Sequence, residues 1–204
     1  IRSGEMPPGE LFSAPALALR FNVSATPVRE AMLNLEKKGF VETVRNKGFR
    51  VTVVSDEDIE NIVAVRRLLE PPVMRELAGA IPAAAYAGLR SLADAIVISA
   101  AGGDLTAYLE ADRLFHAALT DFAGNPRLTD LVSELRQQTR LPGLAGLLAT
   151  DELAQSAAEH HMLLDLLQEG DGEEAEQLMR RHIGHVIGWW AGRPEHDTSL
   201  SARP

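Results

Sequence analysis

The sequence predicts a mostly α-helical protein in which an N-terminal winged helix-turn-helix precedes a C-terminal antiparallel bundle of about six helices. Two observations support this fold class. Residues 1–54 combine two short helical runs with two β-rich segments, whereas apolar residues after residue 55 recur at helical spacing and lack the alternation of strands. We therefore expect a first domain at residues 1–54, a helical domain at residues 55–191 and a loose tail at residues 192–204.

Composition places the chain among ordinary globular proteins. Of its 204 residues, 46% are hydrophobic and 24% are charged, which excludes collagen and wholesale disorder. No apolar run approaches the roughly 18 residues of a membrane-spanning helix, and the absence of cysteine excludes disulfides and thiolate metal sites. We expect a soluble protein that binds no membrane and, since the sequence opens at Ile1 rather than Met, one that lacks a short leading segment here.

Charge is distributed unevenly along the chain. Residues 1–55 hold eight basic and five acidic residues, although the whole chain has 20 Lys+Arg, 29 Asp+Glu and a net charge of −9. No lysine follows Lys47. A basic segment joined to an acidic remainder indicates that the first part faces nucleic acid, with surface variation in a short segment as the alternative.

Two helices are predicted at Ala14–Phe21 and from Thr26 onward. Residues 22–24 form the turn between them, Thr26 is the expected N-cap of the second helix, and Pro27 follows at its first position. Apolar residues from there to Leu35 recur at helical spacing, so one face of the helix packs while the other stays polar.

A β-hairpin with a basic tip is expected after the second helix. Gly39 ends that helix, and the β-rich segments 40–44 and 49–53 flank the tip Arg45-Asn46-Lys47-Gly48. Two helices joined by a turn and followed by a basic hairpin are typical of a fold whose second helix enters the DNA major groove. This order predicts a domain that binds double-stranded DNA.

The stretch VSATPVREAMLNLEKKGFVETVRNKGFRV resembles the DNA-binding domain of GntR-type bacterial transcription regulators, and the resemblance covers residues 9–54. The usual family pattern is VSRTPVREAL, followed by EGLV and a glycine-bearing wing. Four residues are then implied to contact DNA bases or phosphates: Thr26, Arg29, Arg45 and Lys47. Ala25 replaces the first arginine of the pattern, and since a bidentate arginine–guanine contact discriminates by about 1–3 kcal/mol, we expect an operator that differs from the usual one.

Six helices are predicted after residue 55. They are expected at residues 56–79, 82–101, 104–123, 126–141, 150–169 and 172–191, separated by glycine, proline or Asn-Pro. Pro71-Pro72 falls inside the first of them and is expected to kink or split it, because proline removes a backbone hydrogen bond.

Polar side chains interrupt the apolar faces of three of these helices. Asp112 and His116 lie one turn apart on one face, and His160 and His182 lie on the apolar faces of the fifth and sixth helices. Each group is costly in a core unless it is paired or bound, and a divalent cation satisfies all four. Imidazole and carboxylate ligands suit Zn, Ni, Mn or Fe, and an octahedral ion keeps two positions for water or a chelating anion.

Simpler roles for the histidines stay open. Any one of them could be a core imidazole that is hydrogen-bonded to a neighbour. His185 lies one turn beyond His182 and could replace it as a ligand, whereas His161 is rotated by about 100° from His160 and is expected on the surface or behind the ligands. His196 falls in the tail and is assigned no role.

The helical part resembles the FCD effector domain of the FadR-type branch of the GntR family. The resemblance rests on DRLFHAAL with its Asp-x3-His motif, on Asn125-Pro126, on EHHMLLDLLQEGD and on AEQLMRRH. It implies that the metal ligands are Asp112, His116, His160 and His182. Six helices rather than seven make the chain similar to the VanR-like subgroup.

The same resemblance implies a small organic acid that binds through its carboxylate at the metal. An arginine on the first helix of such domains often assists, and Arg66 in VAVRRLLE occupies that position, next to Arg67. Pro71-Pro72 departs from the helix formers that usually follow this motif. The alternative role of Arg66 is an ion pair with Glu70 at i+4.

Three functions compete at this point. The predicted one is a bacterial cytoplasmic transcription regulator, usually a repressor, whose homodimer reads two operator half-sites and responds to the acid. A metalloenzyme is not expected, because the helical stripes place no free Glu, Lys or Tyr beside the ligands as a general base. A regulator with a purely structural metal is the third candidate.

Overall fold

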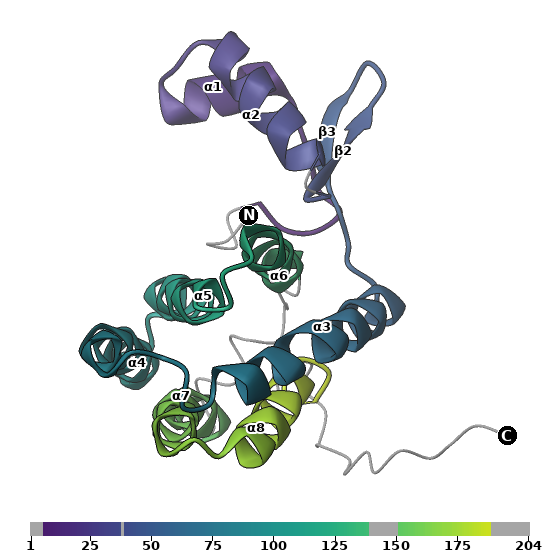
Figure 1. The fold of residues 1–204 in the computed structure, drawn as a ribbon. Helices are drawn as coiled ribbons and strands as arrows, with labels where there is room; N and C mark the ends of the chain where they lie inside the picture. Colours follow the sequence, from purple (N-terminus) through teal and green to yellow (C-terminus); the bar gives the residue numbers. More distant parts are fainter. Residues whose placement is uncertain (1–5, 38, 139–150, 189–204) are drawn as a thin grey trace, which may run out of the picture. The chain divides into compact units, whose positions relative to one another are not determined.

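The computed structural model describes residues 6–37, 39–138 and 151–188. The chain divides into two compact units, Ile1–Ser55 and Asp56–Pro204, whose elements are labelled in Figure 1. Each unit is described by itself.

The N-terminal unit contains two helices and a three-stranded antiparallel sheet. Its elements are β1 (Leu11–Phe12), α1 (Ala14–Phe21), α2 (Ala25–Lys37), β2 (Val41–Val44) and β3 (Gly48–Val51). The strand order is β1-β3-β2, with Leu11 opposite Arg50 and Val41 opposite Val51. The prediction of a winged helix-turn-helix is confirmed, and β1 is an element that sequence periodicity did not predict.

Local caps define α1 and α2. The Ser13 hydroxyl accepts a hydrogen bond from the Ala16 backbone N–H at the start of α1, and Asn22 ends α1 at φ 53°. After α2, Gly39 takes φ 75°, and the Phe40 N–H donates to the Leu35 carbonyl over 2.9 Å. Gly39 therefore closes the helix as predicted.

Helix α2 begins two residues earlier than predicted, at Ala25 instead of Pro27. Thr26 is not the cap, because α2 begins at Ala25 and follows directly on Ser24. The first four N–H groups of a helix have no partner within it, so Pro27 is tolerated as the third residue as well as the first.

The wing turns between β2 and β3. The Lys47 N–H donates to the Val44 carbonyl over 3.0 Å, and Asn46 takes φ 61°. Gly48 follows at φ 126°, and a Cβ there would collide with the carbonyl oxygen of Phe12. Glycine at this position therefore lets β1 approach the hairpin.

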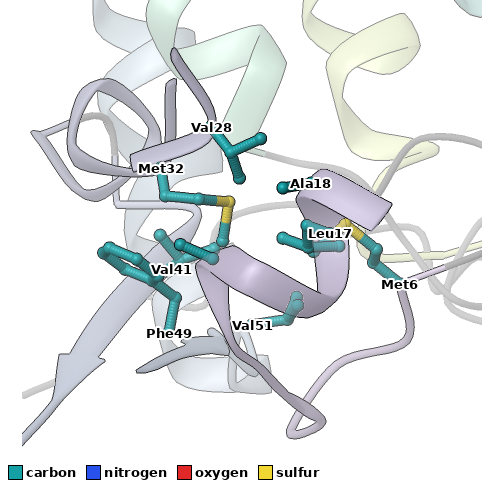
Figure 2. Packing of buried hydrophobic residues seen from close by; sticks show 9 residues of the cluster. Met6, Leu17, Ala18, Val28, Met32, Val41, Phe49 and Val51 are labelled. Atoms are coloured by element: carbon teal, nitrogen blue, oxygen red, sulfur yellow. The ribbon is translucent and has the colours of Figure 1, made fainter. Parts of the chain in front are cut away.

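The core of the N-terminal unit is apolar (Figure 2). Its buried residues come from both helices, the sheet and the segment before them: Met6, Ala14, Leu17, Ala18, Val28, Met32, Val41, Phe49 and Val51. Figure 2 shows the Met32 side chain of α2 beside Val41 and Phe49 of the sheet. This packing holds α2 against the wing and leaves its other face to the solvent.

The C-terminal unit is helical. Its elements are α3 (Asp56–Leu77), a short 3-10 turn η1 (Ala83–Ala85), α4 (Tyr86–Ala101), α5 (Leu105–Asp121), α6 (Pro126–Gln138), α7 (Glu152–Glu169) and α8 (Gly172–Gly184). Helix α3 packs against α8 and α6, α4 against α5 and α7, α5 against α6, and α7 against α8. The prediction of a bundle of about six helices is confirmed. Residues 139–141, 150 and 189–191 of the predicted helices, and the predicted tail at residues 192–204, lie outside the described residues.

Helix α3 continues through Pro71 and Pro72. The expectation that this pair could split the helix is wrong. Each proline removes only its own hydrogen bond to the residue four positions earlier, and α3 has 22 residues. Buried residues on both sides of the prolines, Val63 and Met74 among them, hold the helix in the bundle.

By length and composition, one segment in the described part of the chain, residues 83–101, could cross a membrane. Two charged residues within it are paired with α7. Arg90 Nη2 donates to Asp165 over 2.7 Å, and His161 Nε2 lies 3.0 Å from Asp94. These pairs tie α4 into the helical unit.

Candidate metal centre

Four polar side chains meet inside the helical unit. Helix α5 supplies Asp112 and His116, α7 supplies His160 and α8 supplies His182. One potential ligand atom from each residue lies within 4.8 Å of those from the other three. All four residues are buried. The structure thus brings together the four polar residues that were predicted on the apolar faces of their helices.

The ligand-type atoms approach one another closely. His116 Nε2 lies 3.1 Å from His160 Nε2, and Asp112 Oδ1 lies 3.5 Å from the first nitrogen and 3.3 Å from the second. The His182 ring lies 5.3 and 4.8 Å, centroid to centroid, from the rings of His116 and His160. Three imidazoles and one carboxylate form a donor set that could hold a transition metal.

The environment favours the protonation states that bind a metal. Burial lowers the pKa of His116 well below its ordinary range, and it lowers the pKa of His182 to about 4 although the hydrogen bond to Glu159 opposes it. Burial would raise the pKa of Asp112, but the charge of Arg136 together with the contacts from His116 and His160 holds that pKa well below its ordinary value. At neutral pH, the cluster therefore contains an anionic carboxylate and at least two neutral imidazoles, as metal binding requires.

Glu159 on α7 connects His182 to His185 at the end of α8. Its Oε2 atom accepts hydrogen bonds from His182 Nδ1 over 2.7 Å and from His185 Nε2 over 2.8 Å. Burial would raise the pKa of this carboxyl, but the two hydrogen bonds hold it at about 2. The apolar stripes did not reveal Glu159, although it directly precedes His160. Since two rings engage it, Glu159 is not a free base, and His185 contacts Glu159 instead of replacing His182.

A network of charges reaches the cluster from α3 and α6. Arg66 Nε donates to Glu70 Oε1 over 2.6 Å, so the alternative i+4 ion pair of Arg66 is formed. Arg136 Nη1 donates to Glu70 Oε2 over 2.6 Å, and Arg136 Nη2 lies 3.3 and 3.1 Å from the two Asp112 oxygens. Burial would raise the pKa of Glu70, but the two arginines hold it at about 2. Arg136, rather than Arg66, touches a residue of the cluster.

Sequence reasoning did not single out Arg136. It lies one turn after Val132, the buried residue of α6. A polar residue at this spacing on an apolar face is the same signal that identifies His116.

A small cavity adjoins the histidine rings. It is lined by His116, Glu159, His160, Leu163, Leu178, Met179 and His182. Its volume of about 10 Å³ holds one water-sized occupant, which is too little for an organic acid. Neither Arg66 nor Arg136 is among the lining residues.

The remaining histidines lie apart from the cluster. The His161 side chain is 31% exposed and pairs with Asp94, in keeping with its expected place on the surface. His196 lies outside the described residues.

The four predicted DNA-contacting residues lie on the surface of the N-terminal unit. Thr26 and Arg29 are exposed near the start of α2, and Arg45 and Lys47 are exposed at the tip of the wing. Their exposure leaves these side chains accessible to a DNA backbone.

The winged helix-turn-helix and the separate helical unit define a DNA-binding regulatory protein. The chain belongs to the gntR family of bacterial regulatory proteins: that family model matches residues 1–51, and the model of the FCD domain matches residues 61–185. Members of this family bind operator DNA, and the FCD domain binds a small effector. The protein is thus a transcription regulator and not an enzyme, and the family prediction is confirmed. The VanR-like subgroup stays a prediction.

Relatives along most of the chain are regulators as well. The chain is 29% identical over 209 residues to the HTH-type transcriptional regulator LutR of Bacillus subtilis. This alignment covers 91% of the chain and 94% of LutR. It is 25% identical over 179 residues to the HTH-type transcriptional repressor RspR of Escherichia coli, with coverage of 88% and 78%. Its fold is similar to that of E. coli McbR/YncC, with a TM-score of 0.79, 24% identity and coverage of 93% and 90%.

Proposed function

We propose that this chain is a transcriptional repressor whose operator affinity is controlled by a small organic acid bound at a divalent metal. The metal ligands in this proposal are Asp112, His116, His160 and His182. The observation that carries it is the burial of these four side chains, whose potential ligand atoms lie within 4.8 Å of one another, with the three histidines lining a water-sized cavity. Such groups cost stability in a core unless they bind something.

The chemistry of the donors supports a transition metal. One carboxylate and three imidazoles suit Zn, Ni, Mn or Fe. The lowered pKa values of His116 and His182 leave these rings neutral at physiological pH. When bound, the metal supplies a positive charge that attracts an anionic ligand.

A small carboxylate is the effector class that the surrounding charges favour. Arg66 and Arg136 are held around Glu70, and Arg136 reaches Asp112. We retain Arg66 as a contact for the carboxylate, with Arg136 beside it. Because the cavity admits only a water-sized body, an acid needs side chains or helices to move, and this requirement couples its binding to a conformational change.

The DNA partner in this proposal is a double-stranded operator, read in the bacterial cytoplasm by a homodimer. Arg29 on the exposed face of α2 contacts bases, while Thr26, Arg45 and Lys47 hold phosphates. A two-fold dimer places its two α2 helices on two half-sites. The name of RspR as a repressor supports repression as the mode of action.

A regulator with a structural metal is the second candidate, since the cavity is too small for an acid. Operator affinity measured on metal-loaded and chelator-treated protein, with and without each of a panel of carboxylates, separates the two. We expect one acid to change the affinity about 5- to 150-fold, and only in the metal-loaded protein. Unchanged affinity with every acid, in protein that elemental analysis shows to carry metal, would leave the metal structural.

Arg66 is tested by calorimetry of the same acid. Acid affinity should fall on metal removal and in Arg66→Ala protein. Equal affinity in wild-type, metal-free and Arg66→Ala samples would place the effector elsewhere.

A further inference from the structure

We infer that Glu159, itself held by His185, is a positioning residue that selects the tautomer of His182 and so prepares this ring to bind the metal. The inference rests on the proposed metal site and adds to it two residues that are not its ligands. It starts from a single carboxylate oxygen, Glu159 Oε2, which two imidazole nitrogens approach to 2.7 and 2.8 Å.

The protonation of His182 follows from this contact. An ionised carboxylate can only accept hydrogen bonds, so the His182 nitrogen that faces it, Nδ1, carries a proton. A neutral imidazole has one N–H, and the lone pair of His182 is then on Nε2. A metal-bound histidine commonly donates its other ring N–H to a carboxylate in this way, which fixes the ring and increases its basicity as a ligand.

The same rule shows which ring nitrogen of His185 carries a proton. Its Nε2 donates to Glu159 and therefore offers no lone pair to a metal through that atom. His182 and His185 lie three residues apart at the end of α8, so both reach the same carboxylate on α7. His185, which is buried, holds the same Glu159 oxygen as the cluster ligand His182.

A second metal ion at Glu159, His182 and His185 is the competing explanation. One ligand-type atom from each lies within 4.8 Å of the others. The separations of 2.7 and 2.8 Å are those of charge-assisted hydrogen bonds, which favours a proton over an ion between these atoms.

Metal-free protein provides the first test. Nitrogen-15 NMR of the imidazole rings reports which nitrogen carries the proton, and we expect the Nδ1–H form for His182 in the wild type. Glu159→Ala should shift His182 toward the Nε2–H form, while Glu159→Gln, which keeps an acceptor oxygen, should preserve the wild-type tautomer. An unchanged tautomer in Glu159→Ala would overturn the inference whether or not the protein binds metal.

Zinc affinity, measured by competition with a chromophoric chelator, provides the second test. Glu159→Ala should weaken Zn²⁺ binding about 10- to 100-fold, His185→Gln should weaken it less, and Glu159→Gln should restore most of the loss. His161→Ala is the matched control, since His161 pairs with Asp94 away from the cluster. Melting of each metal-free variant confirms that it is folded.

The outcomes separate the two proposals. A stoichiometry of two Zn²⁺ per chain that falls to one in both Glu159→Gln and His185→Gln would overturn the inference in favour of a second ion. Glu159→Ala with wild-type affinity would also overturn it. Wild-type protein that binds no Zn²⁺, Ni²⁺, Mn²⁺ or Fe²⁺ would contradict the proposed function, and the tautomer experiment would still decide the role of Glu159.

Discussion

The two units differ in what their cores contain. Among the described residues, every buried polar or charged side chain belongs to the helical unit: Arg66, Glu70, Asp112, His116, Thr120, Ser156, His160, His182 and His185. The core of the N-terminal unit is formed by apolar residues. The charged residues that the structure describes in this unit are exposed, Arg29 and Lys47 among them, or partly exposed. The charged groups of the first unit are therefore accessible to a partner at its surface, whereas the second unit holds several of its charged groups in its interior.

This difference has an energetic side. Exchanging a buried ion pair for well-packed apolar residues is often neutral or stabilising, whereas removing one partner leaves a buried charge without compensation. The network of Arg66, Glu70, Arg136 and Asp112 is thus poorly explained as a stabilising device. The ligand site proposed above accounts for it better.

Removal of Glu70 should have the largest effect. Glu70→Ala leaves the guanidinium groups of Arg66 and Arg136 without their shared partner and should destabilise the helical unit by about 3–5 kcal/mol. Urea denaturation measures the change. The control is Glu42→Ala, which breaks the exposed pair of Glu42 with Arg50 in the wing and should cost less than about 1 kcal/mol. Equal losses in the two variants would contradict the distinction between the cores.

Truncation of an apolar core side chain should destabilise the N-terminal unit. Leu17 is 2% exposed, and Leu17→Ala should cost about 2–5 kcal/mol through lost burial and the cavity that remains. Hydrogen exchange followed by mass spectrometry should show faster exchange in α1, α2 and the sheet, with α5, α7 and α8 unchanged. Equally fast exchange in both units would mean that they unfold as one.

Acid should weaken the metal-free helical unit first. The pKa of His182 is lowered to about 4 and that of His116 is also lowered, while both return to ordinary values on unfolding. The unfolded chain then binds more protons below about pH 6.5, so stability falls as the pH drops from there toward 4, by up to about 1.4 kcal/mol per pH unit for each ring. Hydrogen exchange at pH 7 and pH 5 measures this. A larger loss in the N-terminal unit would contradict it.

Surface substitutions in the N-terminal unit should affect DNA binding alone. Arg29→Ala should weaken operator binding by about 1–3 kcal/mol if this side chain reads a base. Lys47→Ala should weaken binding almost equally on all sequences and flatten its salt dependence. Fluorescence anisotropy with operator and unrelated DNA checks both, and metal content should remain that of the wild type. Tight DNA binding by residues 56–204 alone would refute the division of roles.

The sequence predicted the four cluster residues because each interrupts an apolar stripe of its own helix. Asp112 and His116 share one face at i and i+4, so periodicity alone places them together. Arg136 carries the same signal on α6 and was not recognised, whereas Glu159 is defined by partners on another helix. The distance from His182 to Glu159 depends on how α7 and α8 pack, which a single-helix pattern does not encode.

Errors in the fold prediction have similar causes. Strand β1 has two residues, too few for a recognisable alternation, and it forms by pairing with Arg50 and Phe49 far along the chain. The effect of Pro71-Pro72 was overestimated because tertiary packing outweighs a local preference. Apart from the cap of α2, predictions from local patterns failed where two elements had to meet.

The linker between β3 and α3 is short, which limits the distance between the two ends that it joins. Thr52 is bound back to the wing, with its N–H donating to the Phe40 carbonyl over 3.1 Å and its hydroxyl to the Gly39 carbonyl over 2.7 Å. Only residues 53–55 then separate this anchor from the start of α3 at Asp56. Three residues extend over at most about 10–11 Å. A flexible insertion at residue 53 would therefore lengthen the linker without changing any residue of either core. It would show how far regulation depends on the length of this linker.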